Sequence, residues 1–341
     1  MRALYLVEPG KTEIREIDRP TPRNGDVLLR VGRVGFCGGD LNGFRGLFEL
    51  QEYPVVLGHE LGAVIEEIGT GVPDSVRVGM KVTVYPYLNC GICTSCRKGR
   101  PNACQDNRTM GVRRPGAMTR YITVPWSVLF PSERLSLQEL ALVEPLTVGF
   151  HAVNRARIRA GEKVAVIGCG IVGMGAVAAS VSREAEVIAI DIDDSKMETA
   201  RRTGVAHTIN TRKTDLHEAL SDITKGEGPD VIIEAVGNSQ TYRAAVDEVA
   251  YTGRVVYIGY AKKPVEYETG MFVRKEIEIY GSRNCEKAVD FPAAIAYLEK
   301  GTFPVQDVIS RVVSLDEAGQ ALAEWSANPG PITKILVNTE T

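Results

Sequence analysis

The chain has 341 residues, of which 44% are hydrophobic and 24% are charged, and its formal net charge is −3. This length is enough for about two domains, each with a hydrophobic core of its own. Since no block of basic residues occurs, the charge pattern argues against a nucleic-acid partner and against an anionic membrane surface. We therefore expect an ordinary globular protein with neither kind of partner.

The N-terminus turns acidic quickly and lacks the long apolar core of a signal peptide. Seven cysteines, an odd number, fit a reducing cytosol better than a disulfide framework. One uncharged segment, 164–182, is long enough to cross a bilayer. Its four glycines and the alternating strand pattern after it favour a buried strand, a tight turn and a helix instead. We expect a cytoplasmic protein without a membrane-spanning segment.

The first part of the chain, to about residue 150, is predicted to be a β-rich, barrel-like domain. Glycine and proline separate its short apolar segments, and long helical periodicity is absent before about residue 137. The predicted strands are 27–34, 63–68, 81–85 and 119–124. From residue 137, apolar residues recur at helical spacing, so a helix is expected to close this part.

Four cysteines lie close together inside this β-rich part, at Cys90, Cys93, Cys96 and Cys104. Apart from Ile92, the residues between the first three are small or polar, so they cannot bury an apolar face. Four thiolates on so short a loop are typical of a closed, structural zinc site. The alternative is a disulfide cluster, which needs an oxidising compartment. The spacing favours structural zinc, with a role in folding alone.

Strands and helices alternate between residues 163 and 281, which is typical of a doubly wound parallel sheet. The predicted strands are 163–167, 186–191, 231–234, 253–258 and 277–281, and the predicted helices include 195–203 and 241–249. Beyond this region we expect helices near 291–300 and 315–326 and a last strand at 334–337. That strand is expected to return to the first domain. The fold class is therefore α/β with a separate β-rich domain.

A G-x-G-x-x-G motif follows the first strand of the parallel sheet and opens a helix, with its residues at Gly168, Gly170, Ile171, Val172 and Gly173. The glycines permit a tight turn, close approach of a pyrophosphate and close packing of helix on strand. Asp191 ends the next strand, where a carboxylate accepts hydrogen bonds from ribose hydroxyls and repels a 2′-phosphate. The motif therefore predicts NAD in preference to NADP. The alternative is that the glycines only pack a turn and Asp191 only caps a helix.

Three separate fragments offer ligands for a second, catalytic metal. Cys37 lies between glycines, His59 and Glu60 are adjacent, and Glu144 precedes a proline. A thiol, an imidazole and a carboxylate leave one position of a zinc ion open for substrate. Taken fragment by fragment, the spacing is weak evidence, because Cys37 could be a core residue and His59–Glu60 an ordinary surface pair.

Five motifs occur in a fixed order along nearly the whole chain: the Cys37-Gly-x-Asp40 segment, Gly58-His59-Glu60, the four-cysteine loop, Glu144-Pro-Leu and G-x-G-x-x-G. In this order the chain resembles the zinc-dependent medium-chain dehydrogenase/reductase family, within it the polyol, threonine and sugar-acid branch. The resemblance implies a GroES-like catalytic domain at 1–147 and 285–341. It also implies a Rossmann domain at 148–284 and a homodimer or homotetramer.

The same resemblance implies roles for individual residues. Cys37, His59 and Glu144 would bind catalytic zinc, and Glu60 would be a fourth ligand that alternates with water. Asp40 would hydrogen-bond the imidazole of His59 and fix its tautomer.

The chain departs from the family at two positions. Where the family usually has a serine or threonine and a histidine that pass the substrate proton to solvent, this chain has Gly39 and Asn42. Neither side chain can transfer a proton. We expect the proton to leave through a water chain or through Glu60.

Substrate clues come from arginines. The resemblance places Arg45, Arg113 and Arg114 in loops near the catalytic site, and Arg283-Asn284 follows the strand that ends near the nicotinamide. Arginines suit a carboxylate or a phosphate, although each could equally be a solvated surface residue. We expect oxidation of an aldonate-type sugar acid or, next, of a neutral polyol. The alternatives are a sugar phosphate or threonine, a non-catalytic NAD(H)-binding protein, and a zinc-bearing interaction module.

Overall fold

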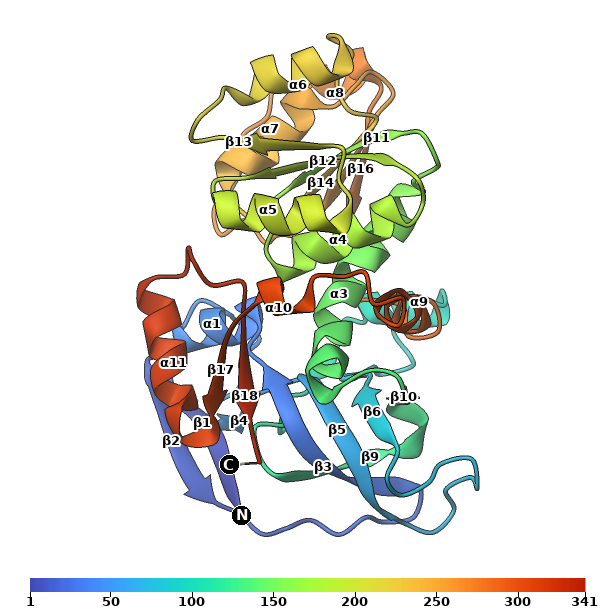
Figure 1. Cartoon of the computed structure of the whole chain (residues 1–341), viewed down its shortest axis with the longest axis vertical. Coiled ribbons are helices and arrows are strands. Elements are labelled where there is room, and N and C mark those ends of the chain that lie inside the picture. The colour runs from blue at the N-terminus through green and yellow to red at the C-terminus, as the bar shows by residue number, and fades with distance from the viewer. Residues whose placement is uncertain (341) are drawn as a thin grey trace. The chain divides into compact units, whose positions relative to one another are not determined.

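The computed structural model describes residues 1–340, which fall into two units (Figure 1). The first unit comprises Met1–Glu144, Glu286–Gly301 and Ile309–Thr341, and the second comprises Pro145–Cys285 and Thr302–Val308. The sequence placed the second unit at 148–284, without the short segment Thr302–Val308. No helix among residues 1–340 is long and apolar enough to cross a membrane.

The first unit is built on a seven-stranded sheet with the order β10-β6-β5-β3-β18-β17, in which β9 also pairs with β3. Its strands are β3 (Asp26–Gly35), β5 (Glu60–Ile68), β6 (Lys81–Val84), β9 (Tyr121–Pro125), β10 (Leu129–Pro131), β17 (Ile309–Ser314) and β18 (Lys334–Asn338). The predicted final strand does return to this unit, since β18 pairs antiparallel with β3. Long β3 is buried along most of its length, and it has strand neighbours on both edges.

Smaller elements complete the first unit. A three-stranded sheet contains β1 (Arg2–Glu8), β2 (Lys11–Glu16) and β4 (Val55–Val56), and a hairpin contains β7 (Tyr87–Leu88) and β8 (Arg108–Thr109). The helices are α1 (Gly38–Phe44), α2 (Thr94–Arg97), α9 (Asp290–Leu298), α11 (Leu315–Ala327) and the first part of α3 (Leu137–Ala156), with 3-10 turns at Pro101–Ala103 and Trp126–Val128. One hydrophobic core joins both sheets, and α11 packs on it through Leu322 and Trp325.

The second unit is an all-parallel sheet of six strands in the order β13-β12-β11-β14-β15-β16. These are β11 (Lys163–Ile167), β12 (Glu186–Asp191), β13 (His207–Asn210), β14 (Val231–Glu234), β15 (Arg254–Tyr257) and β16 (Glu278–Gly281). The helices are α4 (Ile171–Val181), α5 (Asp194–Thr203), α6 (Leu216–Thr224), α7 (Ser239–Glu248), α8 (Gly270–Lys275) and α10 (Val305–Val308). Helices lie on both faces of the sheet (Figure 1), so the predicted doubly wound fold is confirmed.

The predicted uncharged segment 164–182 forms β11, the glycine turn and α4, as expected. Its strand is buried and pairs with β12 on one side and β14 on the other. Because a central strand of a parallel sheet is covered on both faces, it reads as a continuous apolar run rather than an alternating one.

Candidate active site and metal centres

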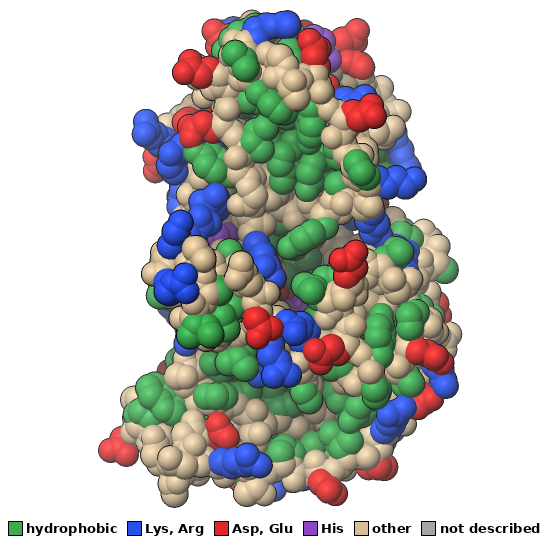
Figure 2. All heavy atoms as spheres, turned by 180° about the vertical axis from the view of Figure 1, so that it is seen from behind, with side chains coloured by type: hydrophobic (Ala, Val, Ile, Leu, Met, Phe, Trp, Pro, Cys, Tyr) green, Lys and Arg blue, Asp and Glu red, His purple; other side chains and the backbone are tan. Residues whose placement is uncertain are grey.

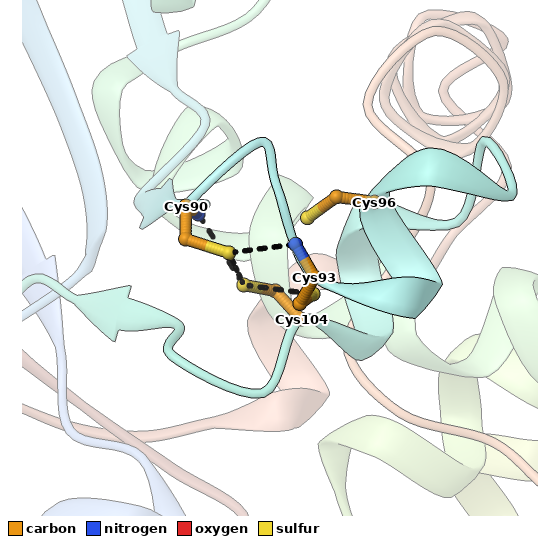
Figure 3. Close-up of side chains that lie close together, drawn as sticks. All are labelled: Cys90, Cys93, Cys96 and Cys104. Atoms are coloured by element: carbon orange, nitrogen blue, oxygen red, sulfur yellow. Dashed lines mark hydrogen bonds between the residues drawn. The ribbon is translucent and has the colours of Figure 1, made fainter.

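The four-cysteine loop brings its thiols together (Figure 3), and all four sulfur atoms lie within 4.8 Å of one another. The Sγ atoms of Cys93 and Cys104 are 3.9 Å apart, and those of Cys104 and Cys90 are 3.5 Å apart. Sulfurs about 2.3 Å from a zinc ion at the corners of a tetrahedron are separated by about 3.8 Å. A disulfide needs about 2.05 Å, and all four cysteines are free thiols. The chemistry and spacing of this donor set fit structural zinc.

A second cluster of ligand atoms is buried at one end of the seven-stranded sheet. Cys37 caps the N-terminus of α1, and His59 and Glu60 stand at the start of β5. Ligand atoms of Cys37, His59 and Glu60 lie within 4.8 Å of one another. Gly35 makes room for the Glu60 carboxylate, since a Cβ at this position would lie 2.2 Å from Oε2. The fold thus brings Cys37 together with the distant pair His59 and Glu60, and all three are suited to zinc.

Glu144 lies beside this cluster, in α3, and its charge acts on both His59 and Glu60. Tyr87 donates a hydrogen bond from its hydroxyl group to Glu144 Oε1. Pro145 follows directly and lacks an N–H group, which interrupts the hydrogen-bond ladder of the helix at this point. The predicted role of Glu144 as a zinc ligand stays a prediction.

Asp40 is buried in the same place and interacts electrostatically with His59. Its Oδ2 accepts a hydrogen bond of 2.7 Å from the backbone N–H of Cys37 and so fixes the start of α1. Neither Asp40 Oδ1 nor His59 Nδ1 has a hydrogen-bond partner among residues 1–340. The predicted bond between the two side chains is therefore not formed in this structure.

Lys334, from β18, supplies a positive charge to the cluster. Its Nζ lies 2.6 Å from Glu60 Oε2 and donates to the carbonyl of Phe36 at 2.8 Å, and both ionic side chains are 1% exposed. An ion pair this deeply buried is strongly coupled, because little water screens the two charges.

The cluster also passes a chemical test for zinc. Burial raises the pKa of the Cys37 thiol and of the Asp40 and Glu144 carboxyl groups. The charges of His59 and Lys334 lower the pKa of the two carboxyl groups, but burial outweighs both, so a further cation is needed to hold them ionised. A divalent ion held by Cys37, His59 and a carboxylate would meet that need.

The glycine motif forms a cradle in the second unit. Gly168 has φ +96°, and a Cβ on Gly173 would lie 1.7 Å from the carbonyl oxygen of Gly168. Gly170 precedes α4, whose N-terminus has no side-chain cap, and Ile171 and Val172 form its first turn. A Cβ on Gly170 would meet nothing within 4 Å among the described residues. Free N–H groups at an open helix N-terminus are suited to a pyrophosphate.

Asp191 ends β12 beside this cradle, but it has backbone partners. Its Oδ2 accepts from the N–H of Cys169 at 2.7 Å, and its Oδ1 accepts from the N–H groups of Ile192 and Asp193. The carboxylate therefore ties the glycine loop to the end of the strand. The predicted contact with ribose hydroxyls stays a prediction.

The arginines expected near the substrate are mostly occupied by protein groups. Arg45 bonds to the side chain and carbonyl of Ser326, and Arg113 pairs with Asp106 at 2.7 Å. Arg114 donates to the carbonyls of Arg108 and Pro86, and burial lowers its pKa to about 10. These contacts give the three side chains structural roles.

Two half-buried residues, Arg283 and Asn284, follow β16 in the second unit.

The residues that sequence reasoning missed are Tyr87 and Lys334. Tyr87 is separated from Glu144 by 57 positions, and Lys334 from Glu60 by 274. No local sequence pattern predicts such pairs. For Lys334 the one available signal is its position as the first residue of an apolar strand.

Two family models match different parts of the chain. Residues 23–134 match the alcohol dehydrogenase GroES-like domain, and residues 172–300 match the zinc-binding dehydrogenase domain. The 2-dehydro-3-deoxy-L-galactonate 5-dehydrogenase of Pseudoalteromonas atlantica is 34% identical over 90% of both chains. The sorbitol dehydrogenase of Bacillus subtilis is 31% identical over 99% of this chain and 97% of its own.

Solved structures agree. The alcohol dehydrogenase RspB of Escherichia coli CFT073, crystallised with NADH, is 30% identical, with a TM-score of 0.89 over 99% of both chains. A similar zinc-binding dehydrogenase was crystallised with NADP. With domain matches over most of its length and near-full-length relatives above 30% identity, the chain belongs to the zinc-dependent medium-chain alcohol dehydrogenase family, whose members are oxidoreductases that use zinc and NAD(P).

Proposed function

We propose that this dehydrogenase oxidises a secondary alcohol of an aldonate-type sugar acid to the ketone, reversibly, with NAD as hydride acceptor. The observation that carries the proposal is the buried cluster of Cys37, His59 and Glu60, whose ligand atoms lie within 4.8 Å of one another. When bound, zinc supplies Lewis-acid stabilisation of negative charge on the substrate oxygen, and NAD accepts the hydride.

The protein's own residues hold and balance this chemistry. Cys37 and His59 supply two ligands, and a third ligand comes from Glu144, with Glu60 in an alternating role. Lys334 neutralises the second carboxylate through its 2.6 Å contact with Glu60. Since Asp191 places a negative charge beside the glycine cradle, it favours NAD over NADP.

The sugar-acid substrate is supported by a relative that is named for a galactonate derivative and is 34% identical. A carboxylate substrate needs a cationic partner in the site. Arg45, Arg113 and Arg114 already bond to protein groups in this structure, so each of them would have to give up a contact in order to bind a carboxylate.

Proton release needs a group other than Gly39 and Asn42. We propose Glu60, aided by water, because its carboxylate lies next to the ligand atoms and next to Lys334. Glu60→Gln should change the pH dependence of kcat. An unchanged pH–rate profile would exclude Glu60 and leave water as the carrier.

The test is NADH formation across a panel of aldonates, polyols, sugar phosphates, simple alcohols and threonine, with zinc counted per chain. We expect two zinc ions per chain and turnover of an aldonate. Cys37→Ser should remove one zinc ion and all turnover, while the structural ion stays. Turnover of neutral polyols alone would reject the sugar-acid substrate.

Gly39 and Asn42 specifically favour one second candidate, an NAD(H)-binding protein without catalysis. In that case NADH would bind while no compound in the panel reacted and the zinc count remained at one.

We also propose that the protein acts in the cytosol as a homo-oligomer. Four thiols arranged for zinc require a reducing compartment. Figure 2 shows hydrophobic side chains gathered on one face of the second unit. In that unit β16 has a strand partner on one side among the described residues, and its Ile279 is 42% exposed. An edge strand with an exposed apolar residue is a template for pairing with a second copy.

A further inference from the structure

Tyr87 connects the four-cysteine loop with the catalytic cluster. It is the first residue of β7, three positions before Cys90, and its strand pairs with β8, which begins four positions after Cys104. The pairs Tyr87↔Thr109 and Leu88↔Arg108 therefore close the base of the loop that the structural zinc would hold. This location fixes the backbone of Tyr87 from both sides.

The ring of Tyr87 is fixed as well. It meets the ring of Tyr85 edge to face, with centroids 5.1 Å apart and planes at 76°. Tyr85 in turn meets Phe291 at 5.7 Å, and Phe291 stacks on Phe130 at 4.6 Å. Aromatic contacts of this kind restrict the side chain to one orientation.

From this fixed position Tyr87 donates its hydroxyl hydrogen to Glu144 Oε1. Both side chains are buried, with 7% of Tyr87 and 2% of Glu144 exposed. A carboxylate that accepts a hydrogen bond in a dry site loses its freedom to rotate, and one of its two oxygens is already occupied.

We propose that Tyr87 is a positioning residue, which holds the Glu144 carboxylate in the orientation that binds catalytic zinc. It acts through Glu144. The proposal rests on the catalytic zinc of the proposed function, and it adds a determinant of zinc affinity outside the ligand set. Partners of metal ligands commonly contribute about 10- to 100-fold to metal affinity.

The test is Tyr87→Phe, which removes the hydroxyl group and keeps the ring. Zinc retained per chain is measured by mass spectrometry after dialysis against a graded series of chelator concentrations. We expect the more weakly held zinc to lose affinity by about tenfold, while the more tightly held zinc is unchanged. Tyr85→Phe is the matched control, since it removes a hydroxyl group from the neighbouring ring and should leave both affinities as they are.

A second background separates positioning from a general structural effect. In Glu144→Ala, which has no carboxylate to hold, Tyr87→Phe should not change the zinc affinity further. The proposal would be overturned if Tyr87→Phe lowered the zinc affinity equally in the wild-type and Glu144→Ala backgrounds. It would also be overturned if Tyr87→Phe lowered the thermal unfolding midpoint enough for general destabilisation to account for the loss of zinc. Unchanged zinc affinity in Tyr87→Phe would overturn it too. If the wild-type chain itself holds only one zinc ion, the proposed function fails first, and the two failures are thereby distinguished.

Discussion

Lys334 and Glu60 form an ion pair in which each side chain is 1% exposed. Removing one partner of such a pair leaves an uncompensated buried charge, which costs about 3–5 kcal/mol. We therefore expect Lys334→Met to lower the free energy of unfolding by about that amount, measured by urea denaturation at neutral pH.

Two further variants check the cause. Adding Glu60→Gln to Lys334→Met removes the second charge and should restore part of the lost stability. Lys11→Met breaks a surface pair with Glu13, whose side chains are 53% and 38% exposed, and should cost less than about 1 kcal/mol. Similar losses from Lys334→Met and Lys11→Met would show that burial does not strengthen the inner pair.

Glu234 gives a pH dependence with a defined sign. Its Oε1 accepts from the N–H groups of Val236 and Gly237, its Oε2 has no partner among the described residues, and burial raises its pKa above the ordinary value of 4.5. The folded state therefore holds the proton of Glu234 more tightly than the unfolded state does. The stability that this protonated group contributes is complete below its pKa in the unfolded chain, and it is lost as the pH rises through its pKa in the folded protein.

We accordingly expect Glu234→Gln to remove this loss. Urea unfolding at pH 5 and pH 8 should show a smaller fall in stability between the two values than in the wild type. Glu227→Gln, an exposed position of the same unit, is the control and should leave the pH dependence intact. If the stability of Glu234→Gln fell between pH 5 and pH 8 as much as that of the wild type, another group would be its cause.

At the scale of residues, some members of the metal sites could be predicted from the sequence and others could not. The four cysteines were predicted from spacing because all their partners lie on one loop. The grouping of Cys37 with His59 and Glu60 was implied by the family resemblance, since local pattern says nothing about contacts between distant segments. Lys334 was not predicted, because an ion pair across 274 positions depends on the pairing of β18 with β3.

At the scale of elements, the turn from β11 into α4 offers a matched pair of substitutions. Gly173→Ala would place a Cβ 1.7 Å from the Gly168 carbonyl oxygen, so it should destabilise the second unit and abolish NADH binding. Gly170→Ala meets no protein atom within 4 Å among the described residues, so it should fold normally and weaken NADH binding alone. Fluorescence titration with NADH and thermal unfolding measure the two effects. Full NADH affinity in Gly170→Ala would place the pyrophosphate elsewhere.

Elements covered on both faces were predicted best. The strands β11, β12 and β14 have the predicted bounds, because buried parallel strands read as short apolar runs between turns. The strand β13, His207–Asn210, was not predicted. It is short and mostly half-buried at the edge of the sheet, so its sequence lacks both an apolar run and an alternation.

At the scale of the whole molecule, self-association can be tested through β16. We expect the wild-type chain to sediment as a dimer or tetramer and Ile279→Lys to shift it toward a smaller species, because a lysine on an edge strand opposes pairing. Val78→Lys, at an apolar position of the first unit that is 61% exposed, should leave the sedimentation unchanged. Unaltered assembly of Ile279→Lys would place the interface away from this edge.

The order of segments in the first unit has a consequence for synthesis on the ribosome. That unit needs β18, which lies between β3 and β17 and carries Lys334, whereas most of the second unit is complete at Cys285. Domains fold as units while the chain emerges. The main segment of the second unit is therefore synthesised before the first unit can complete its sheet. Until β18 has left the ribosome, the end of β3 at residues 33–35 lacks its partner strand and Glu60 lacks its cation. A nascent chain stalled short of residue 334 therefore exposes an unpaired strand end that is prone to aggregation.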